Sequence, residues 1–214
     1  MPDQTTLLCA ICGIRPATTT EHVPPKAIFL RPRPSNLVTV PACFPCNNKS
    51  SATEEEFGVY LAILVADPMH GTSPLWRKQA LRTLDHNNRL ARKVNENLRL
   101  RSVRTPAGLH LGKVGMFQFP ARTYISVIEK TIRGLYYHHY GDVLGPSADV
   151  HASMSHAPTE EFMELTKELK QNSIGGDALI YRFGRAVDSP LYSIWSLQFY
   201  SRNWASGHTN PSGT

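Results

Sequence analysis

The stretches Cys9-Ala10-Ile11-Cys12 and Cys43-Phe44-Pro45-Cys46 decide how the first part of this 214-residue chain folds. They hold all four cysteines of the sequence, in two pairs with the Cys-x-x-Cys spacing. In a reducing compartment this pattern favours a metal site over two disulfides, because four thiolates can surround one tetrahedral Zn²⁺. We therefore expect a structural zinc site at these four cysteines: Cys9, Cys12, Cys43 and Cys46. A shell of four thiolates is closed, so any catalytic chemistry must lie beside it.

Three further elements lie between and beside the cysteine pairs, in a fixed order. Glu21-His22 follows the first pair, Asn36-Leu37 precedes the second, and Asn47 directly follows Cys46. Residues 37–40 predict a short strand that Pro41 ends, and a helix is expected to open at 47–51. This order resembles the HNH endonuclease family, which has a zinc-stapled ββα-metal fold. The resemblance covers residues 7–66.

The resemblance implies a role for each of four residues. His22 matches the general base, and a neutral imidazole near pH 7 can take a proton from water. Glu21 matches an acidic metal ligand, and Asn47 matches the residue that completes the metal site from the start of the helix. Asn36 matches the middle asparagine, which holds the His-bearing loop. The implied reaction is in-line hydrolysis that leaves a 5′ phosphate and a 3′ hydroxyl.

The implied catalytic metal is Mg²⁺ or Mn²⁺, held by oxygens of Glu21 and Asn47. Asparagine is a weak ligand for transition metals, and Asn48 is an alternative ligand. The sequence also departs from the family, because the Gly-Gly common before the middle asparagine is replaced by residues 31–34 with two arginines and two prolines. Candidate contacts to phosphate are the basic residues near the motif: Lys26, Arg31, Arg33 and Lys49.

Each of these residues also has a purely structural interpretation. A histidine beside a glutamate is commonly a solvated pair, although the zinc frame favours the catalytic role for His22. Asn36 fits a turn residue before a strand equally well. Asn47 fits a helix N-cap, and Lys26 and Lys49 fit solvated surface lysines.

The charge of the chain favours a polyanionic partner. The formal net charge is +6 and the pI about 9.3, and lysine and arginine release counterions from a phosphate backbone. Residues 77–104 hold only two acidic residues, Asp85 and Glu96, against nine basic ones: Arg77, Lys78, Arg82, Arg89, Arg92, Lys93, Arg99, Arg101 and Arg104. This stretch can follow a duplex backbone or form a solvated helix face, and the second interpretation is slightly preferred.

No secretory signal or membrane span is expected. The N-terminus lacks a basic region followed by an apolar stretch, and the longest apolar run, residues 60–66, is too short to cross a bilayer. We therefore expect a cytoplasmic protein without a membrane partner.

Beyond residue 68 the periodicity predicts a second domain. Helices are expected at 75–94, 121–140 with Gly141 as C-cap, and 158–171. Strands are expected at 109–119, 178–187 and 191–201, after a linker at 71–74 and before a frayed tail from Ala205. The predicted fold class is α+β: an HNH module at 1–68, then helices on a small antiparallel sheet at 69–214, with a role in DNA binding, dimerisation or regulation.

The leading hypothesis is a metal-dependent HNH endonuclease acting on nucleic acid, with double-stranded DNA preferred to RNA. Proteins of this kind are phage-encoded nucleases, restriction enzymes or anti-phage effectors. The first alternative is a zinc-knuckle module that binds nucleic acid without catalysis. The second is a zinc-stapled scaffold for protein partners, and a homodimer through the C-terminal domain is also open.

Overall fold

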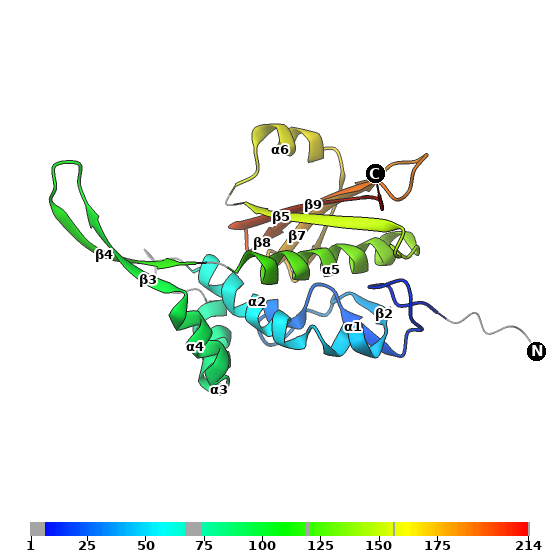
Figure 1. Cartoon of the computed structure of the whole chain (residues 1–214). Coiled ribbons are helices and arrows are strands. Elements are labelled where there is room, and N and C mark those ends of the chain that lie inside the picture. The colour runs from blue at the N-terminus through cyan, green and yellow to red at the C-terminus, as the bar shows by residue number, and fades with distance from the viewer. Residues whose placement is uncertain (1–6, 67–73, 119, 156, 214) are drawn as a thin grey trace, which may run out of the picture.

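Helix α5 (Ala121–Tyr140) runs through the middle of the molecule, between the N-terminal part and a five-stranded sheet (Figure 1). The computed structural model describes residues 7–66, 74–118, 120–155 and 157–213. Within them the chain has the predicted α+β class, with small antiparallel sheets. α5 packs against strands on one side and helix α2 (Ser51–Leu64) on the other, so it joins the two halves.

The bounds of α5 agree with the sequence prediction. Tyr124, Ile128, Ile132 and Leu135 recur at helical spacing and are all buried. Gly141 ends the helix in the left-handed conformation, with φ of 72°, and its N–H bonds the carbonyl of Tyr137 at 2.8 Å. Only glycine adopts this φ without steric cost, which explains the predicted C-cap.

The main sheet is antiparallel, with strand order β5-β9-β8-β7-β6. Its strands are β5 (Ala148–Ser155), β6 (Lys170–Ile174), β7 (Leu179–Arg185), β8 (Ser193–Phe199) and β9 (Asn203–Pro211). β7 and β8 confirm two predicted strands. Alternate residues of β8 point into the core, where Trp195, Leu197 and Phe199 are fully buried.

Two predictions for this region are wrong. The tail from Ala205 is not frayed but lies in β9, between β5 and β8. Its buried residues are small or polar, which hides the strand from a hydrophobicity pattern; Gly207 leaves room for Ile132 of α5. The helix predicted at 158–171 is shorter: α6 (Glu160–Thr166) ends early, and β6 begins at Lys170.

The N-terminal part pairs β1 (Thr19–His22) with β2 (Thr39–Ala42), and α1 (Phe44–Asn48) and α2 follow. A short 3-10 helix, η1 (Lys26–Ile28), lies between the strands. The prediction that Pro41 ends the strand is wrong, because Pro41 pairs with Thr20 inside β2. The carbonyl of Pro41 accepts the N–H of Ala10 at 2.9 Å, away from β1, so the proline nitrogen also faces away from the ladder and its missing N–H costs no hydrogen bond to β1.

One hydrophobic core crosses both predicted domains. The ring of Phe57 on α2 lies 4.8 Å from that of Tyr124 on α5 and 6.0 Å from that of Phe199 on β8. The predicted boundary at residue 68, like most of the 71–74 linker, falls in residues 67–73, outside the described residues. The division into domains stays a prediction.

The single helix predicted at 75–94 is broken into three pieces. η2 (Trp76–Ala80) is one turn of π-helix, and α3 (Leu81–His86) and α4 (Asn88–Glu96) follow. The break lies at Asn87, whose side chain caps α4 by accepting the N–H of Leu90 at 3.0 Å.

After α4 the chain forms a hairpin of β3 (Leu98–Arg104) and β4 (His110–Phe117), which projects from the body (Figure 1). We call this hairpin the β3–β4 arm. β4 matches the strand predicted at 109–119, whereas β3 was not predicted because its arginines extend the basic run of the helices before it. No helix of the described residues is long and apolar enough to cross a membrane.

The close approach of α5 to the end of β1 gives a testable prediction. A Cβ on Gly134 would lie 2.4 Å from Cγ1 of Val23, next to His22. Gly134→Ala should lower the free energy of unfolding by about 1–3 kcal/mol through overpacking, despite the better helix propensity of alanine. Urea unfolding measures this change. Gly115→Ala, whose Cβ meets only Leu98 Cδ1 at 3.4 Å, is the control, and equal stability of the two variants would contradict the packing argument.

Candidate metal centre and the residues around it

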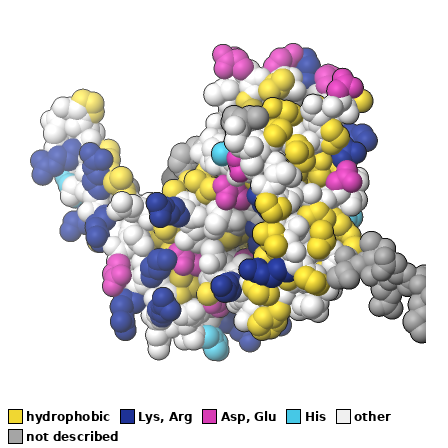
Figure 2. All heavy atoms as spheres, turned by 45° about the vertical axis from the view of Figure 1, so that its right-hand side comes forward, with side chains coloured by type: hydrophobic (Ala, Val, Ile, Leu, Met, Phe, Trp, Pro, Cys, Tyr) yellow, Lys and Arg dark blue, Asp and Glu magenta, His cyan; other side chains and the backbone are white. Residues whose placement is uncertain are grey.

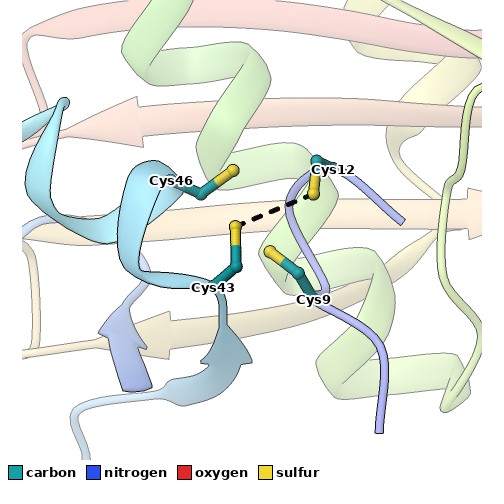
Figure 3. A group of neighbouring side chains, drawn as sticks. All are labelled: Cys9, Cys12, Cys43 and Cys46. Atoms are coloured by element: carbon teal, nitrogen blue, oxygen red, sulfur yellow. Dashed lines mark hydrogen bonds between the residues drawn. The ribbon is translucent and has the colours of Figure 1, made fainter. Parts of the chain in front are cut away.

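The four cysteines meet at one point, as predicted. Their sulfurs all lie within 4.8 Å of one another, and Figure 3 shows them converging from two segments. Cys9 and Cys12 lie in a turn before β1, whereas Cys43 and Cys46 lie at the start of α1. All four thiols are free, and a tetrahedral set of this kind fits a structural Zn²⁺.

The backbone around the cysteines forms two tight knuckles. The N–H of Gly13 bonds the carbonyl of Cys9 at 2.8 Å, and the N–H of Cys46 bonds that of Cys43 at 3.1 Å. Burial opposes ionisation of Cys43, but hydrogen bonds from the Cys46 backbone and from Arg15 outweigh it and lower its pKa to about 7. A thiol that ionises near neutral pH suits a metal ligand, since the thiolate is the binding form.

His22 lies at the end of β1, with its ring half-buried. Burial lowers the pKa of this imidazole, and the charges of Lys26 and Arg33 lower it further. The ring is therefore neutral at pH 7, as a general base must be. The positive charges of Lys26 and Arg33 also favour an anionic ligand beside the ring.

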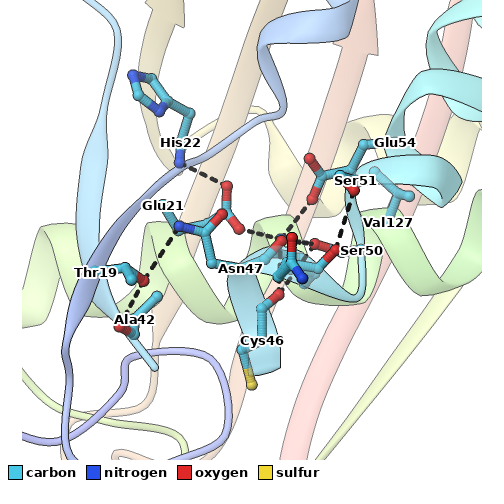
Figure 4. A network of polar contacts seen from close by, with 12 residues as sticks. Thr19, Glu21, His22, Ala42, Cys46, Asn47, Ser50, Ser51, Glu54 and Val127 are labelled. Atoms are coloured by element: carbon cyan, nitrogen blue, oxygen red, sulfur yellow. Dashed lines mark hydrogen bonds and ion pairs between the residues drawn. The ribbon is translucent and has the colours of Figure 1, made fainter. Parts of the chain in front are cut away.

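The ring of His22 and the carboxylate of Glu21 leave the strand on opposite sides (Figure 4). Consecutive residues of a strand point to opposite faces, so this follows from their adjacency. Glu21 is 4% exposed, and one of its oxygens, Oε1, accepts the backbone N–H of His22 at 2.9 Å. Burial raises the pKa of Glu21, and its ion pair with Lys130 opposes that rise.

The ammonium of Lys130 is the centre of a buried polar cluster that sequence reasoning missed. It reaches across from α5 to Oε2 of Glu21 at 2.5 Å, Oε1 of Glu54 at 2.5 Å and Oγ of Ser50 at 2.5 Å. The carbonyl of Cys46, in the zinc knuckle, lies 3.4 Å away. The sequence held one signal of this cluster. Lys130 lies beside the apolar face of a helix that is predicted to be buried, and a buried charge needs an acidic partner.

This cluster bears on the predicted divalent metal. Both oxygens of Glu21 already bond groups of the chain, and a cation, Lys130, already neutralises the carboxylate. Within the part of the chain that the structure describes, the four cysteines are the only group of three or more Cys, His, Asp or Glu side chains able to share an ion. As it stands, with the Lys130 ammonium 2.5 Å from Oε2, Glu21 does not fit a Mg²⁺ or Mn²⁺ site.

The two asparagines of the motif act as links between elements. Asn47 donates from Nδ2 to Oγ1 of Thr19 and to the carbonyl of Thr20, both at 3.1 Å, and so ties α1 to β1. Asn36 donates to the carbonyl of Ser173 and accepts the N–H of Gly175, both at 3.1 Å. These hydrogen bonds attach Asn36 to the β6–β7 turn, whereas the resemblance implied that it holds the loop with His22.

The remaining predicted residues lie on the surface. Asn48 is exposed, and so are the four basic candidates for phosphate contact: Lys26, Arg31, Arg33 and Lys49. Arg33 and Lys26 act on His22 electrostatically, so these two belong to its surroundings. No protein-family model, curated protein or solved structure matches this chain.

The cysteine cluster predicts one zinc ion per chain. Cys43→Ala should lose the ion and unfold the N-terminal part, because structural zinc in small modules contributes on the order of 10 kcal/mol. Elemental analysis of the purified protein and circular dichroism measure both effects. Ala52→Ser, exposed on α2, is the control. A wild-type protein without zinc, or a variant with full zinc content, would contradict the site.

The buried cluster predicts a large stability effect at Lys130. Lys130→Met keeps the length of the side chain but leaves Glu21 and Glu54 without their cation, which should cost about 3–5 kcal/mol. Lys167→Met breaks the exposed ion pair with Glu164 and should cost less than about 1 kcal/mol. Urea unfolding compares them, and similar losses for both would mean that the Lys130 cluster is not a buried link.

Proposed function

We propose that this chain hydrolyses phosphodiester bonds of nucleic acid as an HNH-type endonuclease, with His22 as general base. The observation that carries the proposal is the cysteine cluster, which joins the start of α1 to the turn before β1 and so frames a strand-strand-helix unit around His22. The lowered pKa of His22 and its cationic surroundings support it further. The order of the Glu-His, Asn-Leu and Cys-Asn elements in the sequence also supports the proposal.

The reaction needs a base, a phosphate binder and a leaving group. His22 would take a proton from water, and the resulting hydroxide would attack phosphorus in line with the 3′ oxygen. The bond between phosphorus and that oxygen breaks, and the oxygen takes up a proton, which leaves a 5′ phosphate and a 3′ hydroxyl. Lys26 and Arg33 would offset the negative charge of the phosphate in this step.

The ion implied by the resemblance is Mg²⁺ or Mn²⁺, with Glu21 and Asn47 as ligands. It would have to displace Lys130 from Glu21, against a short ion pair between buried groups. His22, Lys26 and Arg33 would perform the roles given above as groups of the chain itself. A double-stranded DNA substrate and a phage, restriction or anti-phage setting stay predictions, as does a homodimer.

A second candidate function is nucleic-acid binding without catalysis. The specific observation that favours it is the Glu21–Lys130 ion pair, because it occupies the carboxylate that a metal-dependent nuclease would use. The same zinc frame and basic surface would then hold a strand without cutting it.

Cleavage of supercoiled plasmid separates the two candidates. With Mg²⁺ or Mn²⁺ supplied, His22→Ala should nick about 10²–10⁴-fold more slowly than wild type, the range expected for loss of a general base. The neutral ring is the active form, so the wild-type rate should fall as pH drops through the pKa of His22, which lies below the usual value for histidine.

The control for this experiment is His138→Ala, an exposed histidine of α5, which should cleave like wild type. Equal nicking by wild type and His22→Ala would remove the mechanism. Salt-dependent retention of DNA without nicking by wild type would establish the binding module instead. A chain that does neither would be a zinc-stapled scaffold.

A further inference from the structure

A basic groove lies between the loop after His22 and the helices that begin at η2. Its volume is about 480 Å³. Five of its lining residues carry basic side chains: Arg31, Arg33, Lys78, Arg82 and His86. They come from two segments well separated in the sequence, so the linear charge pattern did not reveal the groove.

The walls of this groove are held together by close packing. The side chain of Gln79 on η2 donates a hydrogen bond to the carbonyl of Ala27 on η1. A Cβ on Gly58 of α2 would lie 2.7 Å from that same carbonyl oxygen, so only glycine fits there. The backbone walls of the groove are therefore a built feature of the fold.

The arginine and lysine side chains of the groove have no acidic partner among the described residues. Over the described ranges, no ion pair involves Arg31, Arg33, Lys78 or Arg82. The lining includes one carboxylate, that of Glu55, which accepts a hydrogen bond from Asn87 at 2.8 Å. The groove thus has a net positive charge. Arg33, one of its lining residues, also lowers the pKa of His22 through its charge.

The β3–β4 arm extends the basic surface away from the body. Residues 98–117 hold Arg99, Arg101, Arg104 and Lys113 and neither Asp nor Glu. Arg101 and Arg104 are exposed. Figure 2 shows lysine and arginine side chains along the arm and over the neighbouring part of the body.

We propose that the groove and the β3–β4 arm together bind one duplex of DNA. Two separated cationic surfaces suit a stiff polyanion that can reach both, and a two-stranded ribbon fits the major groove of B-form DNA. The major groove of A-form RNA is too narrow for such a ribbon. The choice of DNA as the partner rests on the proposed function. The basic surface is inferred from the positions of the charges alone.

Binding is measured by fluorescence anisotropy with a short labelled DNA duplex, in the His22→Ala background so that no cleavage interferes. One variant pair removes charge from the groove, Arg31→Gln with Arg82→Gln. A second pair removes it from the arm, Arg101→Gln with Arg104→Gln. The control pair, Lys167→Gln with Lys170→Gln, removes the same charge from exposed positions of α6 and β6.

Each test pair should weaken binding at least about tenfold and lower the slope of log affinity against log salt by about 2, because each phosphate contact contributes about 0.9. Losses no larger than those of the control pair would overturn the proposal. Equal affinity for single-stranded DNA would also overturn it. So would a dimer that dissociates in the arm variant while its DNA affinity stays unchanged. The exposed leucines of the arm, Leu98 and Leu100, would then bind a second copy of the chain. Failure of the nuclease proposal leaves this result intact, because binding is measured without cleavage.

Discussion

The ammonium of Lys130 joins three elements that are far apart in the sequence. It extends from α5 and meets Glu21 on β1, Glu54 on α2 and the carbonyl of Cys46 in the zinc knuckle. A lysine this deeply buried is stable only with its partners in place, so the cluster sets where β1 lies against α5. The position of His22 follows, because it is the next residue along the strand. The zinc site and the candidate base are thus parts of one polar network.

The same network constrains the chemistry. The carboxylate of Glu21 is paired with the ammonium of Lys130, and a divalent ion at the same carboxylate would place a second cation close to the first. The imidazole of His22 faces the other side of the strand, and the charges of Lys26 and Arg33 lower its pKa. The two proposed functions, hydrolysis and binding without cleavage, would use the same surface and would differ in whether His22 activates a water.

Packing also explains how a basic surface arises on residues outside the cysteine cluster. α2 packs closely on η1 through Gly58 and Ala27, and Gln79 of η2 bonds the carbonyl of Ala27, so that Arg31 and Arg33 line the same groove as Lys78 and Arg82. A concentration of like charge on one surface favours an anionic partner. The arm after α4 adds charge without any acidic residue. A binding role accounts for both features, whereas a solvated helix face accounts only for the helices.

The amino-acid sequence by itself determined the features that depend on neighbours in the chain. The cysteine spacing predicted the metal-type cluster, apolar periodicity predicted α5 with its Gly141 cap, and alternation predicted β7 and β8. Only the tertiary structure decided what depends on distant partners: the ion pair of Lys130 with Glu21, the attachment of Asn36 to the β6–β7 turn, and the place of β9 inside the sheet. The physical reason is that a periodic pattern records which face of an element is buried, whereas the charge or hydrogen-bond partner on the opposite element is chosen by how the elements pack.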